Sequence, residues 1–342
     1  MTSFTPVGLT ISAQITPCAN HCRFCLLNER RTHNITVDRF AALIEKFIDY
    51  KDRTGFKVKQ WFGNSYNFPI VEFQKLVGLF FKNGADLKGA QDLRYLLLGG
   101  LPLMEEEAFR SWLLDRQALG CANLAATYCG LELSHDYYCA CTGHFRFQIM
   151  AQKTAAKIGL FNMQRLLILN STLQQLEPLL DELDATGGVN DRHAFVLFYN
   201  GSGKYFEHER PTLEQLQRQS PRVMDLYRGA LNNWKTESDW VAAVLDNPDI
   251  RSRRWMTLRL TDKNIDQLEK MSCEEIVADL SEQTRRAYEA IPRPEELAEK
   301  YSNKTSQKVY MSSWDVEGLW LDRFQAQNPE AVFNRQLIYA GI

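Results

Sequence analysis

Short apolar runs alternate with amphipathic helical patterns over the first two hundred residues of the chain. The first run, residues 9–15, has apolar residues at every second position, which is typical of a strand with one buried face. Residues 37–50 then repeat apolar positions at helical spacing, directly after Thr36, a residue type that caps helix N-termini. This order predicts units of a strand followed by a helix.

The same alternation recurs, and six strand-helix units can be counted. The predicted strands are residues 9–15, 58–62, 94–98, 123–127, 166–169 and 194–199. The later helices are predicted around 73–81, from Glu105, over 145–158, and after a cap at Ser171. Parallel strands with right-handed helical crossovers close into a barrel, and six units make an incomplete one. The sequence therefore predicts an α/β fold, a partial (βα)6 TIM-like barrel over residues 1–210, with its chemistry in the loops that follow the strands.

The pattern changes from about Pro211 onward. Residues 211–342 are mainly helical and highly charged, and a last pair of strand-like segments, 308–311 and 319–321, predicts a short β-hairpin. We expect this second region to pack against the barrel and to close over the substrate.

Composition and charge narrow the class of protein. The chain has 342 residues and a formal net charge of −2, with lysine and arginine spread along it. Nothing resembles the basic patch that binds phosphate backbones, so nucleic acid is not an expected partner. No apolar run approaches the ~20 residues of a membrane helix, and the N-terminus lacks the pattern of a secretory signal. These features predict a cytoplasmic protein without membrane contact.

Eight cysteines without a secretory signal favour reduced thiols that are available to metal over a disulfide framework. Cys18, Cys22 and Cys25 follow the first predicted strand with the spacing C-x3-C-x2-C. Three thiolates on one loop bind three irons of a cubane and leave the fourth iron open to a small molecule. Zinc would need a fourth ligand, and His21 lies inside the loop, where it does not easily reach the same ion.

This spacing at this position, with the aromatic Phe24 before the third cysteine, resembles the radical S-adenosylmethionine (radical SAM) superfamily. The resemblance implies a [4Fe–4S] cluster on Cys18, Cys22 and Cys25 that cleaves S-adenosylmethionine (SAM) reductively to methionine and a 5′-deoxyadenosyl radical. It further implies hydrogen abstraction from a substrate and an external electron donor of the flavodoxin or ferredoxin type. By the same resemblance Phe24 lies against the adenine; the alternative for Phe24 is a solvated aromatic.

Two further segments are similar to the peptide-modifying branch of that superfamily. Gly63, Asn64 and Ser65 stand where the branch has a Gly-Gly-Glu-Pro stretch that meets the methionyl amino group; the alternative is a plain strand-to-helix turn. Thr127 stands in a stretch that resembles Ser-Leu-Asp-Gly, which implies contact with the ribose or carboxylate of SAM.

A third similar segment begins at His135–Asp136 and resembles His-Asp-x-x-Arg-Gly-x-x-Gly-x-Phe. Cys129 and Cys139 stand where the branch has Asp and Arg, so the charged contacts of those residues must be absent or rebuilt, and Arg146 is a nearby substitute. The whole resemblance covers about residues 8–200.

Many members of the branch carry a cysteine-rich SPASM or twitch extension, whereas here only Cys273 lies beyond residue 141. Cys121 and Cys129 are expected at opposite ends of one strand, too far apart for one cubane. One cluster is therefore expected, with Cys121, Cys129, Cys139 and Cys141 as buried or partly exposed thiols. The favoured substrate is a peptide. A small metabolite is one alternative, and a non-catalytic iron-sulfur or zinc-binding regulatory protein is another.

Overall fold

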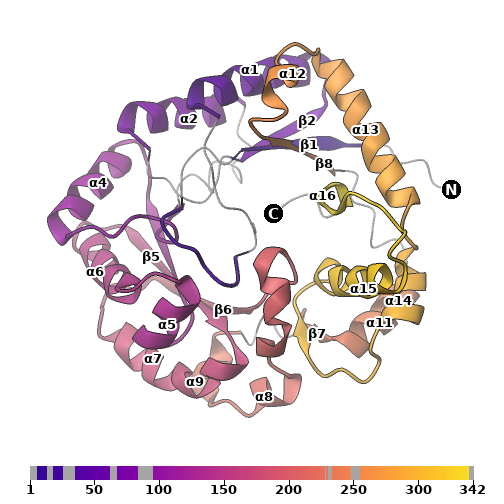
Figure 1. The fold of residues 1–342 in the computed structure, drawn as a ribbon. Helices are drawn as coiled ribbons and strands as arrows, with labels where there is room; N and C mark the ends of the chain where they lie inside the picture. Colours follow the sequence, from indigo (N-terminus) through magenta and orange to yellow (C-terminus); the bar gives the residue numbers. More distant parts are fainter. Residues whose placement is uncertain are drawn as a thin grey trace.

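A ring of helices surrounds parallel strands in the computed structural model, which describes residues 6–13, 18–25, 35–61, 68–83, 95–227, 229, 233–247 and 255–338 (Figure 1). The six predicted strands are all present in the predicted order. They are β1 (Gly8–Ala13), β2 (Lys57–Trp61), β3 (Tyr95–Leu97), β4 (Asn123–Tyr128), β5 (Phe161–Ile168) and β6 (Asp191–Val196). The α/β partial-barrel prediction is confirmed.

The strands form two parallel sheets. β3, β4, β5 and β6 pair in sequence order, and β1 pairs with β2. The other edge of β1 pairs with β8 (Trp255–Leu260), a strand from the C-terminal region, with Leu9 opposite Met256. Buried residues alternate along β8, so a period of two was present in the sequence and was missed within a charged, mainly helical stretch. The C-terminal region therefore contributes a barrel strand as well as helices.

Helices after the strands cover the outside of the sheets. They are α1 (Val37–Thr54), α2 (Ile70–Lys82), α4 (Glu106–Ala118), α5 (Glu132–Cys139), α6 (His144–Lys157) and α7 (Leu176–Asp184). The Thr36 hydroxyl accepts the N–H of Arg39, so the predicted cap of α1 is confirmed. The predicted cap at Ser171 is wrong, because Ser171 lies inside a 3-10 helix, η1 (Asn170–Gln175), that precedes α7. α5 was not predicted.

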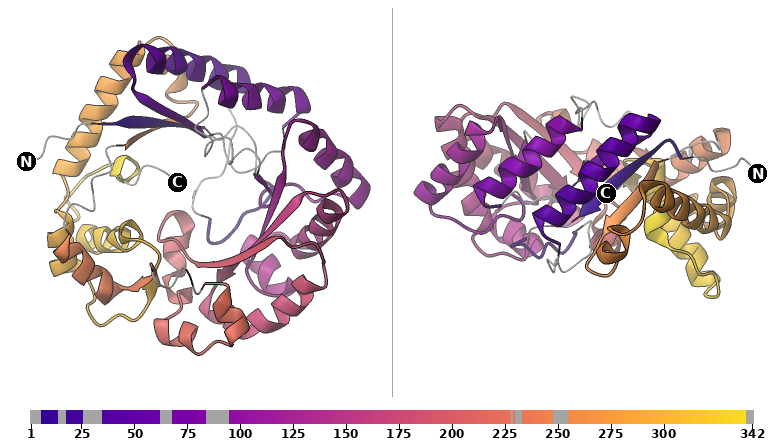
Figure 2. Two further views of the ribbon diagram at one scale, coloured as in Figure 1. Left: turned by 180° about the vertical axis from the view of Figure 1, so that it is seen from behind. Right: turned by 90° about the horizontal axis from the view of Figure 1, so that it is seen from above.

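The C-terminal elements complete the ring between β6 and β1 (Figure 1 and Figure 2). Besides β8 they are α8 (Leu213–Gln217), α9 (Pro221–Asp225), β7 (Lys235–Thr236), α11 (Glu237–Asp246), α12 (Ile265–Leu268), α13 (Cys273–Glu289), α14 (Pro294–Tyr301), β9 (Val309–Tyr310), α15 (Ser313–Gln327) and α16 (Arg335–Ile338). None of the helices in the described part of the chain combines the length and apolarity of a membrane span. The division at residue 210 stays a prediction.

The predicted β-hairpin is wrong. β9 pairs antiparallel with β7, and residues 319–321 lie inside α15. Three successive apolar residues there suggested a strand, but all three are buried within a helix that packs against α14, α11 and β9. Ser312 caps this helix by accepting the N–H of Asp315.

A buried ion pair ties the loop after β6 to α15. The guanidinium of Arg210 lies 3.3 Å from the Asp315 carboxylate, and their side chains are 1% and 0% exposed. Arg210 also donates to Glu207 and to the carbonyl of Val309, while Asp315 accepts the N–H of Tyr199. Each charge is therefore compensated without water.

We expect Arg210→Met to lower the free energy of unfolding by about 3–5 kcal/mol, because it leaves the Asp315 carboxylate buried without its cation. Arg218→Met is the matched control, since Arg218 is 74% exposed and pairs with Glu214 on the surface; it should cost less than about 1 kcal/mol. Equilibrium urea unfolding measures both, and equal losses would contradict the role of the pair.

Candidate active site

The cysteine loop, residues 18–25, lies across the carboxyl ends of the barrel strands. The N–H of Ala19 donates to the carbonyl of Gly100, after β3, and the N–H of Arg23 donates to Tyr138 in α5. The carbonyl of Cys25 accepts the N–H of Ser202, after β6, at 2.7 Å. Because carboxyl ends of parallel strands meet at one side of a barrel, these bonds hold the loop over its mouth.

All three loop cysteines are partly exposed, and the N–H of Cys25 donates to the carbonyl of Cys22, which folds the loop into a turn. His21 points to solvent. The three thiols are therefore accessible to a ligand from the mouth of the barrel, and the imidazole inside the loop stays outside that set.

Phe24 packs against the strand ends instead of extending into solvent. It is half-buried and contacts a cluster of buried side chains that includes Leu167, Leu169 and Leu197, from the ends of β5 and β6. The carbonyl of Phe24 also approaches Gly203, where a β-carbon would lie 3.5 Å from it. The solvated alternative for Phe24 is thus wrong, and its contact with adenine stays a prediction.

A polar row crosses the interior face of the second sheet. Thr127 in β4 is opposite Arg165 in β5, and Arg165 is opposite His193 in β6. The next residue of β4, Tyr128, donates its hydroxyl to Gln152 of α6 on the outside. Side chains alternate along a strand, so Thr127 and Arg165 face the barrel interior. Arg165 was not among the predicted site residues, because it directly precedes the strand predicted over residues 166–169, whereas β5 begins at Phe161.

Arg146, considered as a substitute for the missing family arginine, is on the outer surface. Its side chain is 79% exposed and lies 2.6 Å from Glu132. Its neighbours Phe145 and Phe147 occupy the buried face of α6, so Arg146 points away from the barrel. Within the sheet, the cationic residue directly opposite Thr127 is Arg165.

The His135–Asp136 segment connects α5, α6 and the cysteine loop. Asp136 accepts the N–H groups of Gly143 and Phe145, at 2.5 and 2.9 Å, and so satisfies the start of α6. His135 and His144 lie edge to edge in nearly one plane, with ring centroids 5.2 Å apart. His144 in turn lies 2.9 Å from the side-chain amide of Asn20 in the loop.

The hydrogen bonds assign the protons of the two histidines. The N–H of Cys129 donates to Nδ1 of His135, so the ring proton of His135 is on Nε2, which faces Nδ1 of His144 at 2.9 Å. The proton of His144 is then on Nε2, which lies 2.9 Å from Nδ2 of Asn20. With the Asn20 amide turned by 180°, its oxygen, which otherwise has no partner, accepts this proton. Burial lowers the pKa of His144 to about 4, and burial, aided by His144, holds the pKa of His135 well below its usual range. Both rings are neutral at physiological pH.

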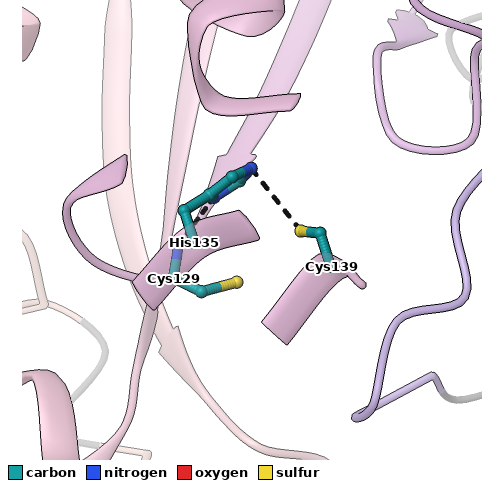
Figure 3. A group of neighbouring side chains, drawn as sticks. All are labelled: Cys129, His135 and Cys139. Carbon is teal, nitrogen blue, oxygen red and sulfur yellow. Dashed lines mark hydrogen bonds between the residues drawn. The ribbon is translucent and has the colours of Figure 1, made fainter. Parts of the chain in front are cut away.

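The remaining cysteines fall largely where the sequence predicted. Cys121 and Cys129 are buried at opposite ends of β4. Cys139 is buried next to Cys129 and His135 (Figure 3), and its pKa is raised chiefly by a hydrogen bond with Cys129, although a bond with Cys22 lowers it. Cys141 is partly exposed, and burial raises its pKa, with Asp136, Cys22 and Cys18 contributing. Gly63, Asn64 and Ser65 lie outside the described residues.

No protein-family model matches the chain, and no curated protein matches it. Solved structures with a similar fold include Streptococcus suis SuiB bound to the precursor peptide SuiA, at 11% identity and a TM-score of 0.42, covering 75% of this chain and 58% of SuiB. The chain thus spans 58% of the length of SuiB. Coproporphyrinogen III oxidase (HemN) from Escherichia coli, a radical SAM enzyme, has 10% identity and a TM-score of 0.46. The match covers 94% of this chain and 91% of HemN. Native anSMEcpe with bound AdoMet and the Cp18Cys peptide has 11% identity and a TM-score of 0.47, and the match covers 95% of this chain and 98% of anSMEcpe.

Gly130, which joins β4 to α5, should not tolerate a side chain. Its φ is +129°, and a β-carbon there would lie 2.7 Å from Oε1 of Gln175 and 3.0 Å from Cγ2 of Thr172. We expect Gly130→Ala to destabilise the fold by about 2 kcal/mol or more. Gly78→Ala, in α2 with no atom within 4 Å, should instead stabilise it by about 0.5–1 kcal/mol. Thermal denaturation followed by circular dichroism distinguishes the two, and equal shifts would refute this account.

Proposed function

We propose that this chain is a radical SAM enzyme, in which Cys18, Cys22 and Cys25 hold a [4Fe–4S] cluster and SAM is cleaved to begin hydrogen abstraction from a substrate. The observation that carries the proposal is the docking of a C-x3-C-x2-C loop over the carboxyl ends of parallel barrel strands. This is the side of such a barrel where reacting groups assemble.

The donor set fits the cluster. Three accessible thiols are available from one loop, and the one imidazole of the loop is turned to solvent, so a cubane there keeps one iron without a protein ligand. Cys18, Cys22 and Cys25 would hold the cluster, which would supply the electron for the reductive cleavage of SAM.

The residues of the chain bind and orient the cosubstrate. Thr127 and Arg165 face the interior side by side, and a hydroxyl and a guanidinium are suited to the carboxylate of SAM. Phe24 borders the same space and is assigned to the adenine. Gly63, Asn64 and Ser65, which follow β2 in the sequence, are assigned to the amino group. The polar row thus takes the role of the arginine that Cys139 replaces.

We assign the substrate to the peptide class, with reduction by an external flavodoxin- or ferredoxin-type donor. The similarity of residues 135–145 to the peptide-modifying branch supports this assignment. A short peptide encoded beside the gene, incubated anaerobically with reduced enzyme and SAM, should change mass. Modification of a small metabolite instead would overturn the peptide assignment and leave the enzyme class intact.

Replacing Cys18, Cys22 or Cys25 individually by alanine should abolish both the visible absorbance of the reconstituted cluster and the formation of 5′-deoxyadenosine. Cys121→Ala is the control, because Cys121 is buried at the opposite end of β4, and it should retain both. Anaerobic reconstitution followed by chromatography of the products measures the effect. Continued 5′-deoxyadenosine formation by a loop variant would disprove the proposal.

Arg165→Met should raise the KM for SAM roughly ten- to hundredfold, since a hydrogen bond to a charged group contributes about 1.5–3 kcal/mol. Cluster content should not change, because Arg165 is not a ligand. Arg146→Met, on the outer surface, should leave the KM unaltered. An unchanged KM in Arg165→Met would remove Arg165 from the SAM site.

A further inference from the structure

The sheet made of β2, β1 and β8 forms one side of the ring (Figure 1). In β8, Met256 is buried against α13, where the hydroxyl of Ser281 donates to its Sδ. Side chains alternate along a strand, so Trp255, Thr257 and Arg259 face the barrel interior. All three are partly exposed, in contrast to the buried residues between them.

The same alternation holds in the neighbouring strands of this sheet. Leu9 in β1 and Val58 in β2 are opposite each other, and both belong to the core beneath the outer helices. Lys57 and Lys59 are therefore on the interior side of β2, with Lys59 opposite Thr10. Both lysines are exposed, so a solute can reach them.

Trp255 and Lys59 form a cation–π pair across β1. A β-carbon at Gly8, which is opposite Trp255, would lie 2.7 Å from Cζ3 and 2.8 Å from Cη2 of the indole. The indole thus lies directly over Gly8, where only glycine leaves room for it. The ammonium of Lys59 is 4.5 Å from the ring centroid. The pair presents a positioned cation beside an aromatic face.

Positive charge is in excess on the interior faces of the barrel strands. The permanent cations that face inward are Lys57, Lys59, Arg165 and Arg259. Among the inward-facing residues of the described strands, the carboxylate is that of Asp191, 3.7 Å from Nδ1 of His193. The whole chain has a net charge of −2, so this excess is local. Among the described residues, no ion pair with a carboxylate involves Lys57 or Lys59.

We propose that the substrate is an acidic peptide, one carboxylate of which binds the ammonium of Lys59 over the indole of Trp255. This inference rests on the function proposed above, in which Arg165 already binds the carboxylate of SAM. A charge-assisted bond from a positioned ammonium suits a carboxylate. The inward cations are on separate strands, so they suit single negative charges along a chain better than one phosphate group.

The position of the anchor limits where the radical acts. Lys59 is level with Thr10, three residues before the end of β1, which is about 10 Å below the start of the cysteine loop. An extended peptide covers this distance in about three residues. The attacked C–H is therefore expected within about three residues of the acidic group, and binding at the anchor would orient it.

The test measures binding by the full chain without reductant, so its result does not require radical chemistry. The probes are fluorescein-labelled pools of short, C-terminally amidated peptides with glutamate at fixed positions, or with glutamine at the same positions. Fluorescence anisotropy should show about tenfold tighter binding of the glutamate pool. Lys59→Met should remove the preference. Lys75→Met, on the outer helix α2 and paired with Asp38, should keep it.

A third pool, with glutamine and a free C-terminus, distinguishes the two sources of a carboxylate: tighter binding than its amide assigns the anchor to the C-terminus. Equal affinity for all pools, or a preference that survives Lys59→Met, would contradict the proposal. Circular dichroism checks that each variant is folded.

Fluorine NMR of the chain labelled with 5-fluorotryptophan locates the bound anion. The resonance of Trp255, assigned with Trp255→Phe, should shift with the preferred pool, and an unmoved resonance would place the anion elsewhere and end the proposal. If the cysteine variants retained 5′-deoxyadenosine formation, the proposed function would fail while these binding results stood, so the two failures are distinguishable.

Discussion

Three backbone hydrogen bonds hold the cysteine loop against the ends of β3, α5 and β6, and the candidate site depends on them. A loop of eight residues does not by itself fix the directions of its side chains, because each residue costs about 1–2 kcal/mol of backbone entropy to order. Here the partners are rigid elements of a parallel barrel whose carboxyl ends necessarily meet. The orientation of three thiols is thereby determined by groups between 81 and 177 residues away in the chain.

Beneath the loop, polar groups form a continuous buried network. The N–H of Cys129, the rings of His135 and His144, and the amide of Asn20 follow one another at hydrogen-bonding distance. Such a network favours one arrangement of its side chains, because a buried polar group without a hydrogen-bond partner loses its hydration without compensation. The two residues of the His-Asp segment therefore support different parts of the structure. His135 is connected to the loop through His144, and Asp136 accepts N–H groups at the start of α6.

Much of this arrangement was accessible from the sequence. Short apolar runs between helical patterns located all six barrel strands, and the spacing of Cys18, Cys22 and Cys25 after the first strand placed the loop at the mouth. β8 was missed because a single alternating run in charged surroundings carries no sign of its distant partner β1. α5 was missed because it is short, with its apolar positions interrupted by His135 and Asp136. Without that helix, the four-residue interval between His135 and Cys139 had no geometric meaning, and their approach to Cys129 was not foreseen.

β1 lies between β2 and β8, strands that are separated by about two hundred residues of chain, so one of its edges stays unpaired until residue 260 has left the ribosome. Contacts of such long sequence separation form late in folding. The segment that leads into the cysteine loop is therefore among the last parts of the barrel to be secured.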